Sequence, residues 1–323
     1  FVWLNRGKES LIANIKDEND IVLLKSIISK ADIFVQNLAP DTLSKVGLDS
    51  DTLRKKNKKL ITCDISGYGE KGPYSDMKAY DLLVQAETGL CSLTGSEDNP
   101  GRVGISVCDI ACGLNAYSLL LEAIIKREYT GKGSSIKVSL FDSLSEWMNV
   151  PFLQYTYTKK APKRAGLSHP SIVPYGCFIT KDKKEILFSI QNEREWKTFS
   201  AELLKLSESE KKMFETPSLR LKNKQKLNKI ISKKFKTLSS KPLIRIMNKF
   251  RIAFGLLKNL KQFAAHPQLK VASSKTHKGK FKFIAPLSLN QNNKFNKVPN
   301  LGEHSKKLRA EFSRSVKQKK IFK

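Results

Sequence analysis

The sequence predicts an α/β fold in which helices flank a parallel sheet in a larger, Rossmann-like domain, followed by a smaller α+β domain. Two observations predict this class. In the first 66 residues, short β-rich runs alternate with apolar stretches of helical period, which is the order of a parallel sheet covered by helices. Beyond Pro151 this alternation gives way to a hairpin pattern and basic amphipathic stretches. With 323 residues, 40% of them hydrophobic, the chain can bury two ordinary cores.

The elements of the larger domain follow from periodicity and from capping residues. Asp17 precedes a stretch with apolar residues at helical spacing, so we expect a helix to begin there. The glycines at 131 and 133 end a long apolar helix and lead into a strand. The expected order is strand 9–16, helix from 17, strand 31–36, helix from 41 or 42 to 56, strand 60–65, helix 82–93, helix 109–126 and strand 135–140.

The second half of the chain is expected to form the smaller domain. Its predicted elements are a hairpin at 175–190, basic amphipathic helices across 192–250, a strand at 280–284 and a short helix after Glu303. The predicted domain limits are 1–155 for the larger domain, 156–285 for the smaller domain and 286–323 for a C-terminal segment.

The net charge of +29 lies entirely in the second half of the chain. Counting Lys and Arg against Asp and Glu gives −2 for residues 1–150 and +31 for residues 151–323. A basic half raises the hypothesis of nucleic-acid binding, because phosphate neutralisation depends on lysine and arginine. These lysines are scattered, however, and no helix-turn-helix, zinc-finger or RNP-like string accompanies them. A solvated lysine surface is the favoured interpretation, and a nucleic-acid partner is not expected.

The five cysteines are odd in number, widely spread and mostly set among apolar neighbours. Buried free thiols are therefore expected, because neither a paired disulfide framework nor a CxxC pair is present. A metal site is not expected. No apolar run approaches the roughly 18 uncharged residues that a membrane helix requires. We expect a soluble protein of the cytoplasm with no membrane partner; a eukaryotic source would also allow the mitochondrial matrix or the peroxisome.

The candidates for chemistry are carboxylates at the junctions between elements. The strings GxSxG, HExxH, Walker A and GxGxxG do not occur, so the hydrolase, metalloprotease, P-loop and dinucleotide-binding classes lack their minimal parts. Asp64, Asp81, Asp109 and Asp142 remain, and each taken alone is more often a cap or turn residue than a catalyst. Asp142 ends a predicted strand and begins a helix, the position where open α/β sheets usually place ligands.

A series of short motifs occurs in order along nearly the whole chain. They are LNRGK at 4–8, ADIFVQN at 31–37, ISGYG at 65–69 with GPY at 72–74, YDLLVQA at 80–86, SLTG at 92–95, RVG at 102–104, TGKG at 130–133, VSLFD at 138–142, HPSI at 169–172 with PYG at 174–176, HPQ at 266–268 and LGEH at 301–304. Together they resemble the class III CoA-transferases, the family that includes formyl-CoA transferase, carnitine CoA-transferase and 2-methylacyl-CoA racemase.

The resemblance implies a transferase that moves CoA from an acyl-CoA, with succinyl-CoA a frequent donor, to a small carboxylic or dicarboxylic acid. The position that matches the family's nucleophile is Asp142. The reaction would then form mixed anhydrides and a CoA thioester on its carboxylate. Acyl-CoA is then a substrate, and no cofactor is bound permanently. Partial desolvation would strengthen a carboxylate nucleophile, while helix amides would keep it ionised.

The resemblance also implies binding residues. The residues expected along the CoA groove are Asn37, Leu38, Lys45, Lys78 and Tyr80. Relatives often have an arginine two residues after this asparagine, where the chain has Ala39, so one phosphate or adenine contact is missing or is supplied elsewhere. His169 or Ser171 would meet the carboxylate of the second acid, although a turn fixed by its prolines explains the same HPS string equally well.

A racemase of the same family is the alternative. Racemases use a His-Asp pair where this chain has Tyr80 and Asp81, with a further aspartate that matches Asp109. Since proton exchange at carbon needs two opposed acid/base groups, and the pKa of tyrosine is near 10, a transferase is favoured. We expect Asp109 to cap the following helix.

The resemblance further implies an interlocked homodimer, in which the C-terminal segment around residues 301–304 returns to the larger domain. Relatives carry roughly 60–70 residues before the LNRGK string, which here begins at Leu4. We therefore expect an N-terminally truncated chain with part of the CoA-binding region missing.

Overall fold

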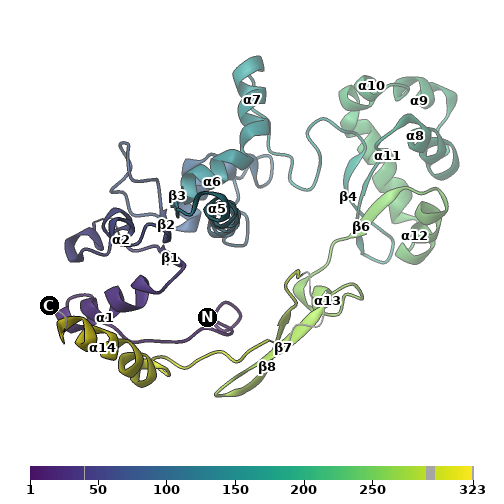
Figure 1. The fold of residues 1–323 in the computed structure, drawn as a ribbon. Coiled ribbons are helices and arrows are strands. Elements are labelled where there is room, and N and C mark those ends of the chain that lie inside the picture. Colours follow the sequence, from purple (N-terminus) through teal and green to yellow (C-terminus); the bar gives the residue numbers. More distant parts are fainter. Residues whose placement is uncertain (40, 289–294, 322–323) are drawn as a thin grey trace. The chain divides into compact units, whose positions relative to one another are not determined.

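The computed structural model describes residues 1–39, 41–288 and 295–321, and the contacts divide the chain into two compact units. Unit 1 comprises residues 1–88, 105–147 and 266–323, and unit 2 comprises residues 89–104 and 148–265 (Figure 1). The domain limits expected from the sequence, at 155/156 and 285/286, stay a prediction.

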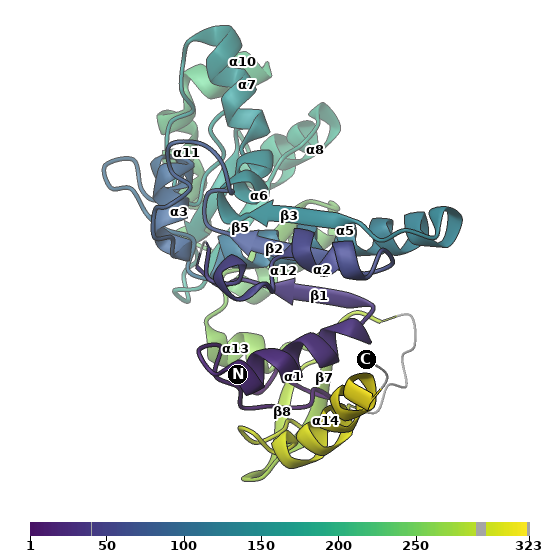
Figure 2. The same cartoon turned by 60° about the vertical axis from the view of Figure 1, so that its left-hand side comes forward.

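Unit 1 contains the predicted parallel sheet, which confirms the expected fold class. Its strands β1 (Ile33–Gln36), β2 (Ile61–Ser66) and β3 (Ser135–Ser139) lie side by side in that order, and both pairings are parallel (Figure 2). Its helices are α1 (Glu18–Ser29), α2 (Ser50–Lys56), α3 (Asp81–Glu87), α5 (Val107–Thr130), α6 (Leu140–Trp147) and α14 (Ser305–Ile321). The hairpin of β7 (Val271–Thr276) and β8 (Gly279–Ile284) also belongs to this unit.

The core of unit 1 forms on two sides of β2. Cys112, Ala116 and Ala123 of α5 pack against the sheet, in a cluster that includes Ile61 and Ile136. A second cluster lies around Leu48, Leu53 and Leu60, between the first two helices and the sheet. The small residues of α5 allow a close approach of helix and strands, which explains why its core-facing side contains Ala and Cys.

Local expectations hold where capping residues define an element. The Asp17 carboxylate accepts the Asp20 N–H at 3.0 Å and caps α1, as predicted.

The helix predicted from residue 41 or 42 to 56 is instead a 3₁₀ turn (Ser44–Val46) followed by α2, because Gly47 has a φ of +64°. The helix predicted over 82–93 is likewise split into α3 and α4 (Leu90–Leu93) by Gly89, whose φ is +80°. Glycine permits these left-handed turns, which the apolar period does not reveal.

The strand predicted at 9–16 is wrong. This segment is extended, but its backbone bonds with side chains of the C-terminal segment rather than with a strand. Ser10 N–H donates to His304 Nδ1 at 3.0 Å and Ile12 N–H donates to Ser305 Oγ at 3.0 Å. Beside it, α14 lies along α1 (Figure 1), where Arg309 pairs with Asp20.

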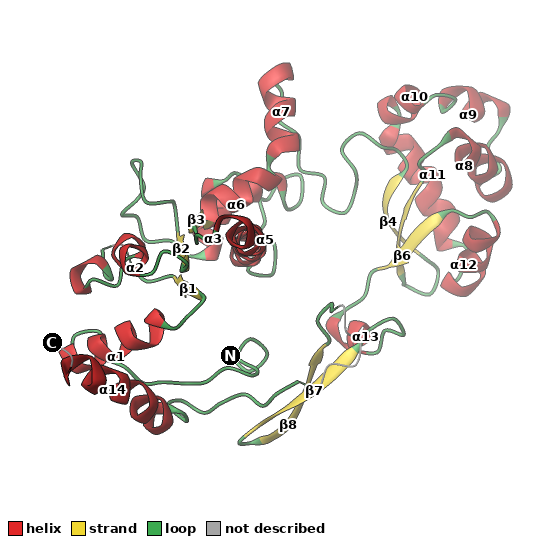
Figure 3. Cartoon of the chain, in the orientation of Figure 1, coloured by secondary structure: helices red, strands yellow, loops and turns green. Residues whose placement is uncertain are grey.

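Unit 2 has an antiparallel sheet under a set of short helices (Figure 3). The predicted hairpin is present as β4 (Tyr175–Ile179) and β5 (Glu185–Ser189), and β6 (Ala253–Leu256) pairs with β5. The helices are α4, α7 (Asn149–Thr158), α8 (Glu193–Thr198), a π-helical turn (Phe199–Leu204), α9 (Glu208–Met213), α10 (Pro217–Lys222), α11 (Lys224–Lys236), α12 (Ser240–Lys249) and α13 (Leu260–Ala264). One core is formed by residues of β4, β5, α8, the π-helical turn, α11 and α12, and in it Phe188 contacts Phe178, Phe199 and Phe235.

One helix in the described part of the chain, α5, is long and apolar enough to cross a membrane by length and composition, which we did not expect from the sequence. One face of it packs on the sheet of unit 1. The core helix of a soluble protein passes the same test, so this single helix is weak evidence for a membrane span. The expected cytoplasmic location stays a prediction.

Candidate active site

The candidate nucleophile lies where β3 passes directly into α6. The hydroxyl of Ser139, which is 1% exposed, donates to Asp142 Oδ2 at 2.6 Å and accepts the Asp142 N–H at 2.9 Å. Among the described residues, no hydrogen bond reaches Asp142 Oδ1. Asp142 is exposed and lies in the first turn of α6, where the helix dipole favours a negative charge. The arrangement fixes one carboxylate oxygen and leaves the other accessible.

A groove of about 410 Å³ lies at the carboxyl ends of β1 and β2. Its lining residues are Gln36, Leu38, Ala39, Asp41, Leu43, Ser44, Asp49, Ser50, Asp51, Asp64, Ile65, Ser66, Gly69, Glu70, Ser75, Asp76 and Lys137. Asp142 does not line it, but Ser66 of the lining is the register partner of Ser139. The groove and the Ser139–Asp142 junction therefore lie at the carboxyl edge of the same sheet.

The carboxylate of Asp64 organises the floor of this groove. It accepts hydrogen bonds from Gln36 Nε2 at 2.9 Å and from Ser50 Oγ at 2.6 Å. Gln36 Oε1 in turn accepts the Leu38 N–H at 2.8 Å. Asp64 therefore orients the turn after β1, and its contacts indicate a structural role rather than a catalytic one.

The lining of the groove is acidic. Six of its residues are Asp or Glu, and its one lysine, Lys137, pairs with Glu70. That pairing raises the pKa of Lys137, chiefly through the hydrogen bond from its ammonium to the carboxylate. An acidic wall repels phosphate groups and other anions.

The structure brings some of the predicted CoA-binding residues to this groove and leaves others outside. Leu38 lines it, and Asn37 precedes Leu38 on the same turn. Lys45 is exposed beside Ser44 of the lining. Lys78 is exposed and Tyr80 is 72% exposed, and neither lines the groove. Their role in binding CoA stays a prediction.

The two aspartates considered for proton exchange have structural contacts. Asp81 Oδ1 accepts the Cys108 N–H at 2.7 Å, and Oδ2 accepts Gln85 Nε2 at 2.7 Å. The prediction that Asp109 caps α5 is wrong, because the helix begins at Val107 and Asp81 supplies the acceptor from α3. Burial raises the pKa of Asp109, and the neighbouring Asp81 adds to this effect.

The expectation of buried thiols holds for three of the five cysteines. Cys63, Cys108 and Cys112 are buried, whereas Cys91 and Cys177 are partly exposed, and all five are free. Burial raises the pKa of Cys108 to about 12 and that of Cys63 to about 11. These thiols are therefore neutral and unreactive at physiological pH.

In unit 2, the predicted carboxylate-binding residues share a short loop. His169 Nδ1 accepts the N–H of Ser171 at 3.2 Å and the N–H of Ile172 at 3.0 Å, and its ring stacks on Tyr175 with centroids 5.4 Å apart. The Ser171 side chain is exposed, with its hydroxyl 3.3 Å from the same ring nitrogen. The HPS string therefore does form a structured turn, and the histidine is its centre.

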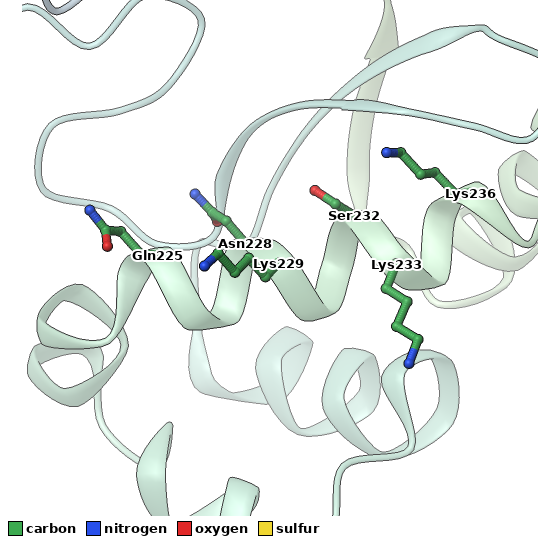
Figure 4. A pocket seen from close by; sticks show the side chains of 6 residues that line it. All are labelled: Gln225, Asn228, Lys229, Ser232, Lys233 and Lys236. Carbon is green, nitrogen blue, oxygen red and sulfur yellow. The ribbon is translucent and has the colours of Figure 1, made fainter.

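A second, wide-open hollow of about 580 Å³ lies on one face of α11 (Figure 4). It is lined by Gln225, Asn228, Lys229, Ser232, Lys233 and Lys236. Its lysines make no ion pair with the described acidic residues. This is the lysine surface that the charge distribution indicated.

Comparison with known proteins identifies the family. The family model described as CoA-transferase family III matches residues 1–305. The chain therefore belongs to that family, and the resemblance drawn from its motifs is confirmed. It is 32% identical over 271 residues to a human succinyl-CoA:glutarate CoA-transferase, covering 83% of this chain and 61% of that protein. It is 36% identical over 189 residues to an acetyl-CoA:oxalate CoA-transferase of Acetobacter aceti, covering 58% of this chain and 49% of that protein.

Solved structures share the fold. A CAIB/BAIF family protein from Brucella suis matches with a TM-score of 0.82 and 29% identity, over 95% of this chain and 82% of that one. The protein Rv3272 from Mycobacterium tuberculosis matches with a TM-score of 0.82 and 20% identity, over 95% of this chain and 85% of that one, a likeness that concerns the fold alone. The chain spans roughly half to two thirds of the length of the curated relatives named above.

Proposed function

We propose that the protein is a CoA-transferase that moves CoA from an acyl-CoA to a small carboxylic acid, with Asp142 as its nucleophile. The observation that carries this proposal is the Ser139–Asp142 junction, in a chain of CoA-transferase family III. One oxygen of the carboxylate is held by the buried hydroxyl, and the other is unbonded and accessible. Such a group is oriented for attack on a carbonyl carbon.

The proposed reaction has four balanced steps. Asp142 Oδ1 attacks the thioester carbonyl, and CoA thiolate leaves a mixed anhydride. The thiolate attacks the aspartyl carbonyl, which releases the first acid and leaves an aspartyl-CoA thioester. The acceptor carboxylate attacks this thioester and again frees CoA thiolate, and the thiolate then takes the acyl group from the second anhydride. Asp142 is regenerated, and no external oxidant, reductant or metal is needed.

The proposed substrates are succinyl-CoA and a short dicarboxylic acid. Relatives named for succinyl-CoA with glutarate and with mesaconate support this class. His169 and Ser171 are proposed to receive a carboxylate of the acid, since both present polar groups on an ordered loop. CoA is proposed to lie along Asn37 and Leu38, with its charged groups met by Lys45. Lys78 and Tyr80 are proposed to contact the same molecule from the segment before α3.

A racemase has less support from the site. Both carboxylate oxygens of Asp81 accept hydrogen bonds within the fold, and Tyr80 stands where racemases of the family have a histidine. An acid/base pair for proton exchange would have to be released from these contacts.

The deciding experiment is a CoA-transfer assay with succinyl-CoA and a panel of mono- and dicarboxylic acids. Asp142→Asn should lower the rate by at least about 10³-fold, because the nucleophile is lost, without changing the melting temperature. Asp98→Asn, an exposed aspartate in unit 2, is the matched control. With succinyl-CoA, intact-mass analysis of the wild type should show a covalent CoA adduct, and peptide mapping should place it on the peptide that contains Asp142. A wild-type rate in Asp142→Asn would remove this residue from its role. Deuterium exchange at carbon 2 of a 2-methylacyl-CoA would favour the racemase.

We also propose that the chain forms a homodimer. Helix α7 has no buried residue, and its apolar side chains Val150, Phe152 and Tyr157 are all strongly exposed. On α5, Leu114 and Ile125 are more than half exposed. Apolar surface of this kind is typical of a protein interface. Light scattering after gel filtration should give twice the chain mass, and a monomer at micromolar concentration would contradict the proposal.

A further inference from the structure

Helix α11 has its apolar and its charged residues on separate faces. Leu227, Ile231 and Phe235 are fully buried in the core of unit 2. The opposite face lines the hollow of about 580 Å³ described above, through residues at helical spacing from 225 to 236 (Figure 4). Because the apolar face is already packed within unit 2, α11 cannot insert it into a lipid bilayer or into the groove of another protein.

The hollow on α11 is lined by polar side chains. Lys229, Lys233 and Lys236 are exposed, whereas Asn228 and Ser232 are half-buried and lie deeper between them. Within the described part of the chain, none of the lining side chains makes a hydrogen bond or an ion pair. Their ammonium, amide and hydroxyl donors are therefore available, and all three kinds of group bind phosphate oxygens in complexes with nucleic acids.

The lysines of α11 also have no acidic neighbours along the chain. Residues 216–265 contain 14 lysines and arginines and no aspartate or glutamate. Lys229 and Lys233 are four residues apart, and Lys233 and Lys236 are three residues apart, so that like charges repel one another along the helix. A bound polyanion would neutralise these charges and remove the repulsion.

The composition of the lining distinguishes among polyanions. An acidic peptide would need apolar or aromatic anchors in addition to charge, and the described lining offers none. The flat surface of an anionic membrane would not reach the half-buried Asn228 and Ser232. Unpaired bases would need an aromatic ring on which to stack, and none lines the hollow. The backbone of a double-stranded nucleic acid needs only the positive charges and hydrogen-bond donors that are present.

We propose that the hollow on α11 binds the phosphate backbone of double-stranded nucleic acid without sequence preference. This inference does not rest on the proposed transferase function. From the sequence a nucleic-acid partner was not expected, because the lysines are scattered along the chain. The structure brings three of them to one hollow, together with uncharged donors that the charge count does not reveal.

The test measures binding of the full chain to fluorescent DNA and RNA duplexes of about 20 base pairs, between about 50 and 200 mM salt. Binding should be independent of sequence and should weaken steeply with salt. The triple variant Lys229→Gln, Lys233→Gln, Lys236→Gln should lower the affinity by at least about 10-fold. It should also make the slope of log affinity against log salt less steep by about 2 to 3, because each lysine–phosphate contact contributes about 0.9.

A matched control removes the same net charge elsewhere in unit 2. Lys181→Gln, Lys183→Gln and Lys184→Gln, in the exposed turn between β4 and β5, should change the affinity by less than about 3-fold. Equal losses in the two triple variants would show that only net charge matters and would overturn the site. Absence of duplex binding by the wild type at about 50 mM salt would do the same.

A single substitution tests the deeper part of the hollow. Ser232→Asp places a negative charge between the lysines and should weaken duplex binding at an unchanged melting temperature, and a wild-type affinity would contradict the site. Single-stranded RNA, phosphatidylserine vesicles and polyglutamate are the alternative ligands. Tighter binding of any of these than of the duplex would overturn the choice of partner. All of these measurements are made without CoA or acid substrates, so their outcome is separate from that of the transfer assay.

Discussion

The two units differ in the residues that form their cores and in the polar groups that they present. Unit 2 has one continuous core rich in aromatic rings, in which Phe188, Phe199 and Phe235 are all fully buried. Unit 1 has two smaller clusters of aliphatic residues, alanine and cysteine, and its strand ends present hydroxyls and carboxylates. A parallel sheet brings polar groups from several strands to one edge, which suits a reaction site, whereas an aromatic core suits a rigid support.

The largest effect should come from breaking the core of unit 2. Phe188 is 1% exposed and contacts three other aromatic rings, so Phe188→Ala should lower the free energy of unfolding by about 3–5 kcal/mol. Ile179→Ala, on the exposed side of β4, should cost far less. Urea unfolding gives the energies, and limited proteolysis with mass spectrometry should show new cleavage within 148–265. Cleavage distributed equally over both units would weaken the contrast between them.

A smaller effect is expected at the β3–α6 junction of unit 1. Ser139→Ala removes the hydroxyl that caps α6 and holds Asp142, so it should cost about 1 kcal/mol of stability. It should also lower kcat in the proposed transfer reaction, while Ser139→Thr retains both properties. Thermal unfolding and rates measured on the folded protein separate the two roles. A stability loss with an unchanged kcat would show that the hydroxyl only caps the helix.

The third prediction concerns how stability depends on pH in unit 2. Hydrogen bonds from Ser240, and then from Thr180, lower the pKa of Asp182 to about 2. Because the folded pKa is below the unfolded value of about 3.9, the stabilisation is fully present above about pH 4 and is lost as the pH falls through about 2. Asp182→Asn should therefore be less stable than wild type at pH 7, and the difference should shrink toward pH 2. Urea unfolding across this range, with Asp98→Asn as control, makes the comparison; a constant difference would refute it.

Part of the candidate site could be predicted from the sequence. The spacing of Ser139 and Asp142 is that of a helix cap, and the strand before it and the helix after it follow from local periodicity. The hydrogen bonds between Ser139 and Asp142 could therefore be predicted from the sequence, although only Asp142 was proposed as a site residue. The groove was not predictable, because its lining comes from the ends of different strands and from the segment after β2.

The sequence by itself determined the alternation of strands and helices, the junction that presents Asp142 and the motifs of the family, since all of these depend on residues near one another in the chain. Only the tertiary structure decided that Asp81 would cap α5, that residues 9–16 would bond with the C-terminal segment and that Lys224 would reach His169. These contacts join residues 27 to 294 positions apart. Side-chain partners at such separations are chosen by how the elements pack, and local patterns contain no information about that choice.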